Sequence, residues 1–383
     1  MSAFIHDAVR TPRGKARKGG GLTGLMPEEL VAALVDGLEA RGREPRRLAE
    51  MLLLSCVGQV DAQGGHIGMV AKLKAGLRPE AAAHSLNNFC AGGLSAIGHA
   101  AAAVMAGQSD FVLAGGVEML SRVPFMADRA SYYTATDMPP ELRYIPVALA
   151  ADLLAERLGI TRAALDAVAL TSQTRAVAAE ARPGLQASRL TVAGLGHDEA
   201  VRGTTAEALA TLPPAFPGLA AEYRAIVGDG PFSHRHTLAH APPLADGAAL
   251  ALIGPEQGAG RPRARILAFA ERGGDARDSL TAGTAAMEAV LARTGLTLRD
   301  IDRVEFMEAF AVTIARFLRD YDVDPERVNV GGGHIAKGHP MGATGAILTS
   351  ALLDALDEAD GRLGLVVASG AQGVGVAMIV ERL

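Results

Sequence analysis

The 383-residue chain has only two cysteines and no tryptophan, and aromatic residues make up just 4% of it. Cys56 and Cys90 are too few for the disulfide framework of a small secreted domain, and neither has a second cysteine at metal-ligand spacing. The N-terminus lacks the basic stretch and apolar core of a signal peptide. We therefore expect a reducing compartment, the cytoplasm. The 45 glycines indicate close backbone packing and many tight turns.

The chain also lacks a large excess of charge of either sign, since it has 37 Lys and Arg residues and 42 Asp and Glu residues, a formal net charge of −5. This balance excludes a global field that attracts nucleic acid or an anionic membrane, so a polyanionic ligand must be bound locally. Apolar runs stay well short of the roughly 20 residues that a membrane span needs. With 49% hydrophobic residues and about twice the usual domain length, the chain can build more than one packed unit.

Short apolar runs alternate with helical patterns in both the N-terminal and the C-terminal part. The predicted order of strand, helix and strand falls at residues 51–60, 92–106 and 111–114, and again at 303–306, 341–356 and 363–367. Such alternation predicts an α/β protein with a mostly parallel sheet and helices on its faces. Each part also carries a turn rich in small residues, at 87–93 and 331–345. Two similar halves are therefore predicted.

The pattern changes between these halves. Amphipathic helical stretches at 147–158 and 162–179 are separated by connections that contain proline and glycine, which indicates an insertion. An apolar strand at 246–253 then returns to the sheet. The predicted units are an N-terminal half at residues 1–117 plus 244–264, an inserted loop domain at 118–243, and a C-terminal half at 265–383.

Cys90 is the first candidate for chemistry, because it stands at a strand-to-helix turn directly before a pair of glycines, Gly92 and Gly93. Backbone N–H groups at a helix N-terminus lower the pKa of a thiol below about 8.5 and make it a better nucleophile. Small neighbours let an acyl carbonyl approach backbone donors. The alternative is a buried small hydrophobic residue, the usual role of a free cysteine. Cys56 lies within an apolar run and is predicted to be core.

His339 is the second candidate, held between Gly338 and Pro340 on a glycine-rich loop that leads into a helix. This placement suits a general base for a thiol or a donor to a thioester oxygen, although a lone histidine is more often structural. The loop superficially resembles a phosphate loop. That interpretation is excluded, because Lys337 is followed by Gly338 and the Walker pattern requires Ser or Thr there.

Six segments, taken in order, resemble the thiolases, the acyl-CoA:acetyl-CoA C-acyltransferases, and the resemblance covers essentially the whole chain. The segments are Arg-Thr-Pro-Arg-Gly-Lys at 10–15, Asn-Asn-Phe-Cys-Ala-Gly-Gly at 87–93, residues 114–121, residues 198–205, Met-Glu-Ala-Phe-Ala at 307–311, and Gly-His-Pro with Gly-Ala-Thr-Gly at 338–345.

The resemblance implies a five-layered αβαβα core, a loop domain that grips coenzyme A, and a homodimer or homotetramer. It implies that Cys90 takes the acyl group as a thioester and that His339 activates it. Arg202 stands in the place of an arginine near the adenine of coenzyme A, with a solvated surface charge as the alternative. Coenzyme A is then a cosubstrate, without a permanent cofactor or a metal.

Three positions depart from the family pattern. Met307 replaces the asparagine that holds the water of an oxyanion hole, and its side chain has no amide to do so. Ser369 falls where thiolases have a second cysteine, or Val367 does if the alignment slides by two residues; a serine hydroxyl is a poor base. Pro242 stands where a serine usually contacts pantetheine. His334, Glu308 and His240 are alternative bases, each equally able to be structural.

The leading hypothesis is an acyltransferase of fatty acid metabolism that loads Cys90 from acyl-CoA, with thiolysis or Claisen condensation of 3-oxoacyl-CoA as its net reaction. The altered Met307 and Ser369 positions leave a second hypothesis, acyl transfer without carbon–carbon chemistry. A third is a catalytically silent subunit that binds CoA thioesters.

Overall fold

The computed structural model describes residues 2–230 and 232–383. Its strands form one sheet with the order β4-β3-β5-β6-β1-β7-β10-β9-β8, and the short β2 pairs with β6. The strands are β1 (Phe4–Arg10), β2 (Gly14–Lys15), β3 (Met51–Ser55), β4 (Ala82–Leu86), β5 (Val112–Met119), β6 (Ala245–Gly254), β7 (Ala264–Gly273), β8 (Arg303–Phe306), β9 (Leu363–Gly370) and β10 (Val374–Arg382).

The α-helices range from single turns to five turns. They are α1 (Pro27–Ala40), α2 (Pro45–Leu48), α3 (Ile67–Lys74), α4 (Gly92–Met105), α5 (Val147–Arg157), α6 (Arg162–Glu180), α7 (Ala206–Ala210), α8 (Leu219–Glu222), α9 (Arg224–Val227), α10 (Ala282–Thr294), α11 (Ala311–Asp320), α12 (His334–Lys337) and α13 (Thr344–Glu358). None of the described helices is long and apolar enough to cross a membrane.

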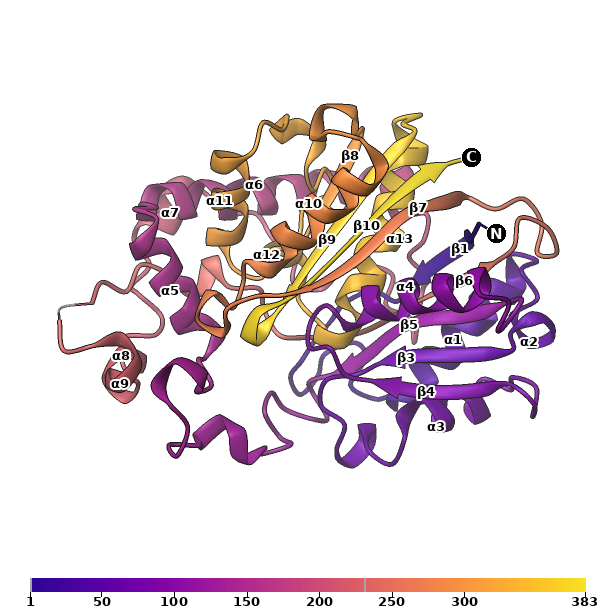
Figure 1. Ribbon diagram of the computed structural model, residues 1–383, viewed down its shortest axis with the longest axis horizontal. Helices are drawn as coiled ribbons and strands as arrows, with labels where there is room; N and C mark the ends of the chain where they lie inside the picture. Colours follow the sequence, from indigo (N-terminus) through magenta and orange to yellow (C-terminus); the bar gives the residue numbers. More distant parts are fainter. Residues whose placement is uncertain (1, 231) are drawn as a thin grey trace.

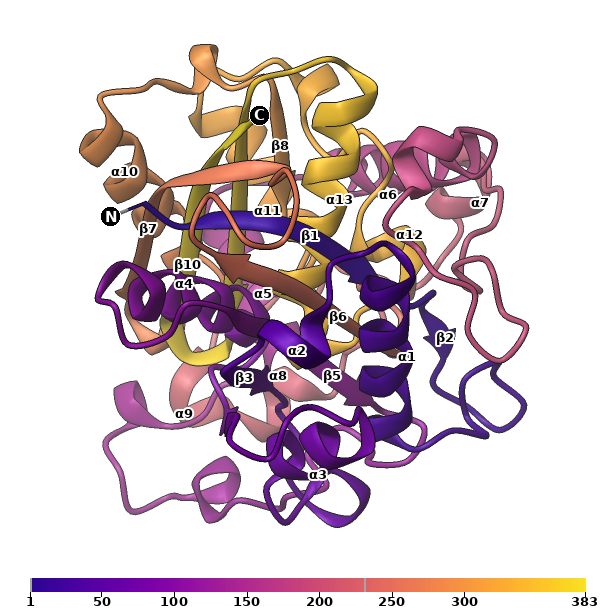
Figure 2. The ribbon, with the colours of Figure 1, turned by 90° about the vertical axis from the view of Figure 1, so that its right-hand side faces the viewer.

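The sheet has two halves that meet along β1. The first half, β4-β3-β5-β6-β1, is drawn in indigo to magenta for most of its strands, and the second, β7-β10-β9-β8, in orange and yellow (Figure 1). Within the described residues they are joined where Phe4 and Ile5 of β1 pair with Arg265 and Ala264 of β7, with β1 running between β6 and β7 (Figure 2). The strand–helix–strand units β3-α4-β5 and β8-α13-β9 confirm the predicted repetition.

The prediction of a mostly parallel sheet is wrong. Among the paired strands of the described residues, only β3–β4, β3–β5 and β8–β9 are parallel, whereas β1, β6, β7 and β10 pair in antiparallel fashion. A parallel pair needs a crossover, usually a helix, but β10 follows β9 after a tight turn at Ala371–Gly373. The strand predicted at 51–60 also ends early, at Ser55. The Cys56 N–H still donates to the carbonyl of Leu86, and the N–H groups of Val57 and Gly58 then turn toward Glu118.

Helices cover both faces of each half and produce five layers, which confirms the predicted αβαβα core. On the outside of the N-terminal half lie α1 and α3, and on the outside of the C-terminal half lies α10. Between the halves, α4 packs against β5 and β10, and α13 packs against β6 and β9. The two central helices approach closely at glycines: a Cβ on Gly345 would lie 2.2 Å from the backbone nitrogen of Leu94.

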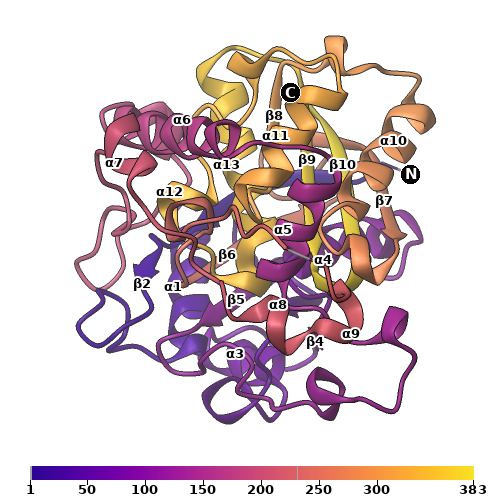
Figure 3. The ribbon, with the colours of Figure 1, turned by 90° about the vertical axis from the view of Figure 1, so that its left-hand side faces the viewer.

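The segment between β5 and β6 contributes α5 to α9, which lie at one end of the molecule (Figures 1 and 3). A buried ion pair ties it to β1, since the Arg10 guanidinium donates to Asp198 at 2.8 Å. The backbone N–H of Arg13 donates to the same carboxylate at 2.9 Å. These cations hold the pKa of Asp198 well below its usual range despite burial. The segment is therefore anchored to the start of the N-terminal half.

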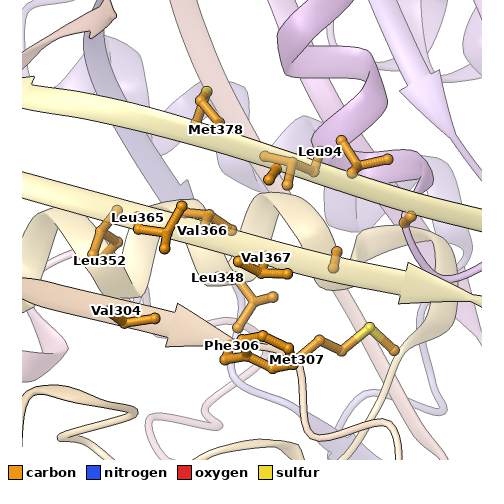
Figure 4. Close-up of a cluster of buried hydrophobic side chains, with 14 of the residues drawn as sticks. Leu94, Val304, Phe306, Met307, Leu348, Leu352, Leu365, Val366, Val367 and Met378 are labelled. Carbon is orange, nitrogen blue, oxygen red and sulfur yellow. The ribbon is translucent and has the colours of Figure 1, made fainter. Parts of the chain in front are cut away.

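The core of the C-terminal half sits between β8, β9 and α13. Its side chains interdigitate around Phe306, Val367 and Leu348 (Figure 4). Met307 follows directly after β8 and extends from the edge of this cluster (Figure 4). The core thus ends where the cavity described below begins.

Candidate active site

A cavity of about 590 Å³ lies where the two halves and the inserted segment meet. Its walls combine the turn before α4, the end of β8, the loop before α13, the end of β9 and the segments around 123–148 and 238–244. All six residues predicted for the site are among those that line it: Cys90, Arg202, Pro242, Met307, His339 and Ser369. Residues separated by as much as 279 positions in the printed numbering are thereby brought to one chamber.

Cys90 immediately precedes Ala91, the N-cap residue of α4, as the sequence predicted. The thiol is surrounded by protein and opens only partly to the cavity. Burial, followed by the Glu118 carboxylate, raises the pKa of Cys90 to about 12. The predicted lowering of this pKa by the helix is therefore wrong, because the lost hydration of the thiolate outweighs the backbone donors at the helix start. Cys90 is a neutral thiol at pH 7.

His339 is held in one orientation at the start of the segment that leads into α13. Its Nδ1 shares a hydrogen bond of 2.7 Å with the Thr344 hydroxyl, and its backbone N–H donates to the Pro243 carbonyl at 2.9 Å. This leaves Nε2 as the nitrogen available to the cavity. Burial, followed by the Arg13 guanidinium, lowers the pKa of His339 to about 3. The imidazole is therefore neutral, which leaves Nε2 as an acceptor, and the same shift makes it a weaker base than an ordinary histidine.

Arg13 has a second effect on the histidine loop, which the sequence did not reveal. Its guanidinium donates to the carbonyl of Gly338 at 3.1 Å, and its side chain is buried. Gly338 has φ +103°, a left-handed conformation that favours glycine. The arginine therefore positions the residue before His339 while its charge disfavours the imidazolium.

Glu118 is a further site residue that sequence analysis missed. It is fully buried at the end of β5, and its two oxygens accept from the backbone N–H groups of Val57 (2.8 Å), Gly58 (3.0 Å) and Gly342 (3.0 Å). The side chain of Gln63 donates to it as well, at 2.8 Å. Glu118 thus fastens the loop after β3 to the loop that carries His339. An acidic residue within an apolar strand was the only signal in the sequence.

Met307 and Ser369, the positions where the resemblance predicts an asparagine and a second cysteine, both line the cavity. Met307 is buried, and its thioether is only a weak acceptor. The Ser369 hydroxyl lines the cavity and accepts from the backbone N–H of Gly283 at 3.2 Å. Val367, two residues earlier, packs in the core instead (Figure 4). Of the two alignments, the one that uses Ser369 puts a polar group into the chamber.

The three alternative bases do not belong to the described lining of the cavity. Glu308 is buried and accepts from the Ser172 hydroxyl at 2.7 Å. His240 is bonded through Nε2 to Asp166 at 2.7 Å, and burial lowers its pKa to about 4. His334 is buried behind His339, with 5.5 Å between the ring centroids. Glu308 and His240 thus have hydrogen-bond partners of their own, whereas both ring nitrogens of His334 are without one among the described residues.

At the outer part of the cavity the side chains become solvent-accessible. Arg202 is exposed and Pro242 is half-buried, while Leu238 and Leu244 are 75% and 48% exposed. Among the described residues there is no group of three or more His, Cys, Asp or Glu side chains that could hold a metal ion.

Family models account for nearly the entire chain. Residues 3–257 match the model described as thiolase, N-terminal domain, and residues 260–382 match thiolase, C-terminal domain. The chain belongs to the thiolase family. Its five-layered core and its two similar halves are the fold of that family.

Several curated relatives align with this thiolase from end to end. A steroid 3-ketoacyl-CoA thiolase of Mycobacterium tuberculosis is 32% identical, covering 100% of this chain and 94% of the relative. A beta-ketoadipyl-CoA thiolase of Escherichia coli is 35% identical, covering 100% and 99%. A 3-ketoacyl-CoA thiolase of Shewanella baltica is 34% identical over the same shares. Thiolases are acyltransferases that act on CoA thioesters, which agrees with the predicted class of activity.

Proposed function

We propose that this thiolase transfers acyl groups from acyl-CoA through a thioester on Cys90, with thiolysis or condensation of 3-oxoacyl-CoA as its net reaction. The observation that carries the proposal is the meeting of Cys90 and His339 in one cavity, although they come from different halves of the chain. The names of the relatives, which are 3-ketoacyl-CoA thiolases of several kinds, support the same reaction.

Acylation follows from the protonation states of the two groups. Cys90 is a neutral thiol and His339 a neutral imidazole, so a thiolate–imidazolium pair does not form in advance. The sulfur attacks the thioester carbonyl while its proton passes to Nε2 of His339. The tetrahedral oxyanion then collapses, the bond to the sulfur of coenzyme A breaks, and the imidazolium returns the proton to that sulfur. Acyl-Cys90 and free coenzyme A result.

The carbon–carbon step demands more of the site. It needs a base for the acetyl methyl group and donors for the enolate, and Met307 and Ser369 stand where those groups are expected. If each lost donor or base costs on the order of 10²–10³ in rate, condensation falls far more than acylation does. The substitutions therefore favour a second candidate function, acyl transfer from Cys90 to another nucleophile without carbon–carbon chemistry.

One set of measurements separates these functions. Intact-mass analysis after incubation with acetyl-CoA, and then with a longer acyl-CoA, is expected to show an acyl increment that is absent from Cys90→Ala. Thiolysis of acetoacetyl-CoA measured beside CoA release from acyl-CoA then decides between the two: rapid thiolysis excludes the second candidate. Absence of any increment together with normal CoA binding contradicts both and favours a silent thioester-binding subunit.

Coenzyme A itself is proposed to bind at the outer part of the cavity, as a cosubstrate without a permanent cofactor. Arg202, exposed at the cavity, would meet the negative charges of the nucleotide part, and Pro242 would contact the pantetheine. Arg202→Ala is expected to raise the KM for acyl-CoA while leaving kcat nearly unchanged. Equal KM values would remove Arg202 from the binding site.

We also propose self-association and a cytoplasmic location. β4 is the last strand of the sheet on its side, and the neighbouring α3 exposes Met69 and Leu73, the latter to 69%. A second copy that pairs with this edge would cover both features and make a homodimer, and two such dimers a homotetramer. Light scattering should report the dimer or tetramer, and Leu73→Glu should shift it to the monomer. The unpaired Cys56 and Cys90 support the reducing cytoplasm.

A further inference from the structure

A second, much smaller cavity lies beside the glycine-rich loop that carries His339. It has a volume of about 10 Å³, and residues 331–334 and Lys337 of that loop form part of its wall. The apolar part of the wall includes Leu348 of α13, which is labelled in Figure 4. Five polar residues line the cavity, each at most 5% exposed, and none of them lines the active-site cavity: Arg10, Arg13, Glu305, His334 and Lys337. The cavity is therefore a separate, buried and strongly polar site.

Several polar atoms around this cavity lack a partner within the described residues. Both ring nitrogens of His334 and Nε of Arg13 are buried and make no hydrogen bond there. The ammonium group of Lys337 lies at the same wall, since a Cβ on Gly331 would be 3.4 Å from its Nζ. A buried polar atom without a partner costs about 1–3 kcal/mol, so atoms that no protein group reaches are generally bonded to ordered water. These atoms indicate a bound molecule that forms hydrogen bonds.

Glu305 and Lys337 have lost hydration that the protein does not replace. Burial raises the pKa of Glu305 and lowers the pKa of Lys337, in each case towards the neutral form. For Glu305 the nearby cations act in the opposite direction, but they are weaker than the lost hydration. A small polar molecule between the two groups restores part of that hydration.

The volume limits this molecule to a single water. A space of about 10–15 Å³ is the least that holds one water, and a buried water makes roughly two to four hydrogen bonds. The wall offers both kinds of partner, because the Glu305 carboxylate accepts and the Lys337 ammonium donates. Burial lowers the pKa of His334 well below its usual range, so its neutral ring adds one donor and one acceptor. An organic ligand does not fit this space.

The charges around the cavity balance, which disfavours an ion. The lining contains three cations and one carboxylate: Arg10, Arg13, Lys337 and Glu305. Two more carboxylates stand directly behind it. Asp198 accepts from the Arg10 guanidinium at 2.8 Å, and the carboxyl carbon of Glu308 would lie 2.2 Å from a Cβ on Gly333. A bound ion of either sign would leave an uncompensated buried charge, so a neutral molecule is favoured.

We propose that this cavity binds one water molecule, which donates to the Glu305 carboxylate and accepts from the Lys337 ammonium. Glu305 belongs to β8, and Lys337 ends α12 two residues before His339. The water thereby ties the loop that carries His339 to a strand of the C-terminal half. The inference goes beyond the proposed function, because this site binds neither coenzyme A nor an acyl group.

A crystal structure of the wild-type protein at about 1.5 Å resolution tests the site directly. One density peak is expected in the cavity, at about 2.7–3.2 Å from Nζ of Lys337 and from a carboxylate oxygen of Glu305. Crystals soaked in sodium bromide should show no anomalous peak there. A cavity without density overturns the proposal, and so does an anomalous peak, which identifies an anion.

Water relaxation provides a second readout, in solution. Ala351 of α13 lines the cavity, and Ala351→Val adds two methyl groups to its wall. Oxygen-17 relaxation dispersion should then report one long-lived water fewer per chain than in the wild-type protein, and the Tm should fall by a few degrees. Ala285→Val, at an exposed alanine of α10, is the matched control for the lower helix propensity of valine and should keep the water count. An unchanged water count in Ala351→Val overturns the proposal; if this variant does not fold, the crystal structure decides.

Discussion

Alkylation of Cys90 by iodoacetamide should increase with pH without a plateau below pH 10. The thiolate is the reacting species, and burial raises the pKa of Cys90 from 9.0 to about 12. At pH 8 about 10⁻⁴ of the thiol is then ionised, against about 10⁻¹ for an unperturbed cysteine. The rate should therefore be about 1000-fold lower than that of a reference thiol, and should rise about tenfold for each pH unit.

His339 should not change this behaviour, because its pKa of about 3 keeps it neutral at every pH tested. His339→Asn is expected to leave alkylation within a few-fold of the wild-type rate. The same variant should slow acylation by acyl-CoA by about 10²–10⁴, since the histidine accepts the proton only as the carbon–sulfur bond forms. The two reagents therefore separate an activated sulfur from a base-assisted attack.

The assay is peptide mass mapping after timed exposure between pH 6 and pH 10, which distinguishes Cys90 from the buried Cys56. An alkylation rate at Cys90 that is high and constant from pH 6 to pH 8, and that drops in His339→Asn, would refute the reasoning. It would show a preformed thiolate–imidazolium pair, and so a site in which burial does not dominate.

Three further predictions concern stability. The pKa of His339 is about 3 when folded and about 6.5 when unfolded, so its contribution to the free energy of unfolding is present above pH 6.5 and is lost as the pH falls. Between pH 7.5 and pH 5.5, the decrease in the free energy of unfolding should therefore be about 1.4 kcal/mol smaller in His339→Asn than in the wild-type protein. Urea titration at both pH values measures this difference. Gly116→Ala places a Cβ 2.2 Å from the carbonyl oxygen of Gly342 and should cost about 3 kcal/mol by the same method, whereas Gly24→Ala, with open space around it, should be neutral. Asp198→Asn leaves a buried guanidinium without its carboxylate and should cost about 3–5 kcal/mol, seen as a lower Tm; an unchanged Tm would contradict the pairing.

Much of the secondary structure could be predicted from the local sequence pattern. The small apolar residues of α4 and the short strand β8 were placed correctly from the sequence, because helix and strand periodicity are properties of neighbouring residues. The direction of the strands could not be predicted in this way. The antiparallel pairings of β6 and β10 depend on where the chain returns to the sheet, which periodicity does not encode.

The residues of the candidate site likewise fall into those that the sequence indicated and those that only the structure showed. Cys90 and His339 could be selected from the sequence because each stands in a short motif with a recognisable backbone requirement. The structure alone showed that Ser369 lines the cavity while Val367 packs in the core. Both side chains point to the same face of β9, and Ser369 reaches the chamber because it stands at the end of the strand. Glu118 was missed because its bonding partners come from two segments that are distant in the sequence, residues 57–63 and Gly342.

Protonation was decided entirely by tertiary structure. The sequence places Cys90 at a helix start, and that local effect by itself predicts a lowered pKa. The opposite direction results from burial under segments far along the chain and from Glu118, just as Arg13, distant in sequence, helps keep His339 neutral. Hydration and Coulomb interactions depend on distance in space, so residue types and spacing determined which groups react, and only packing determined the charge each of them carries.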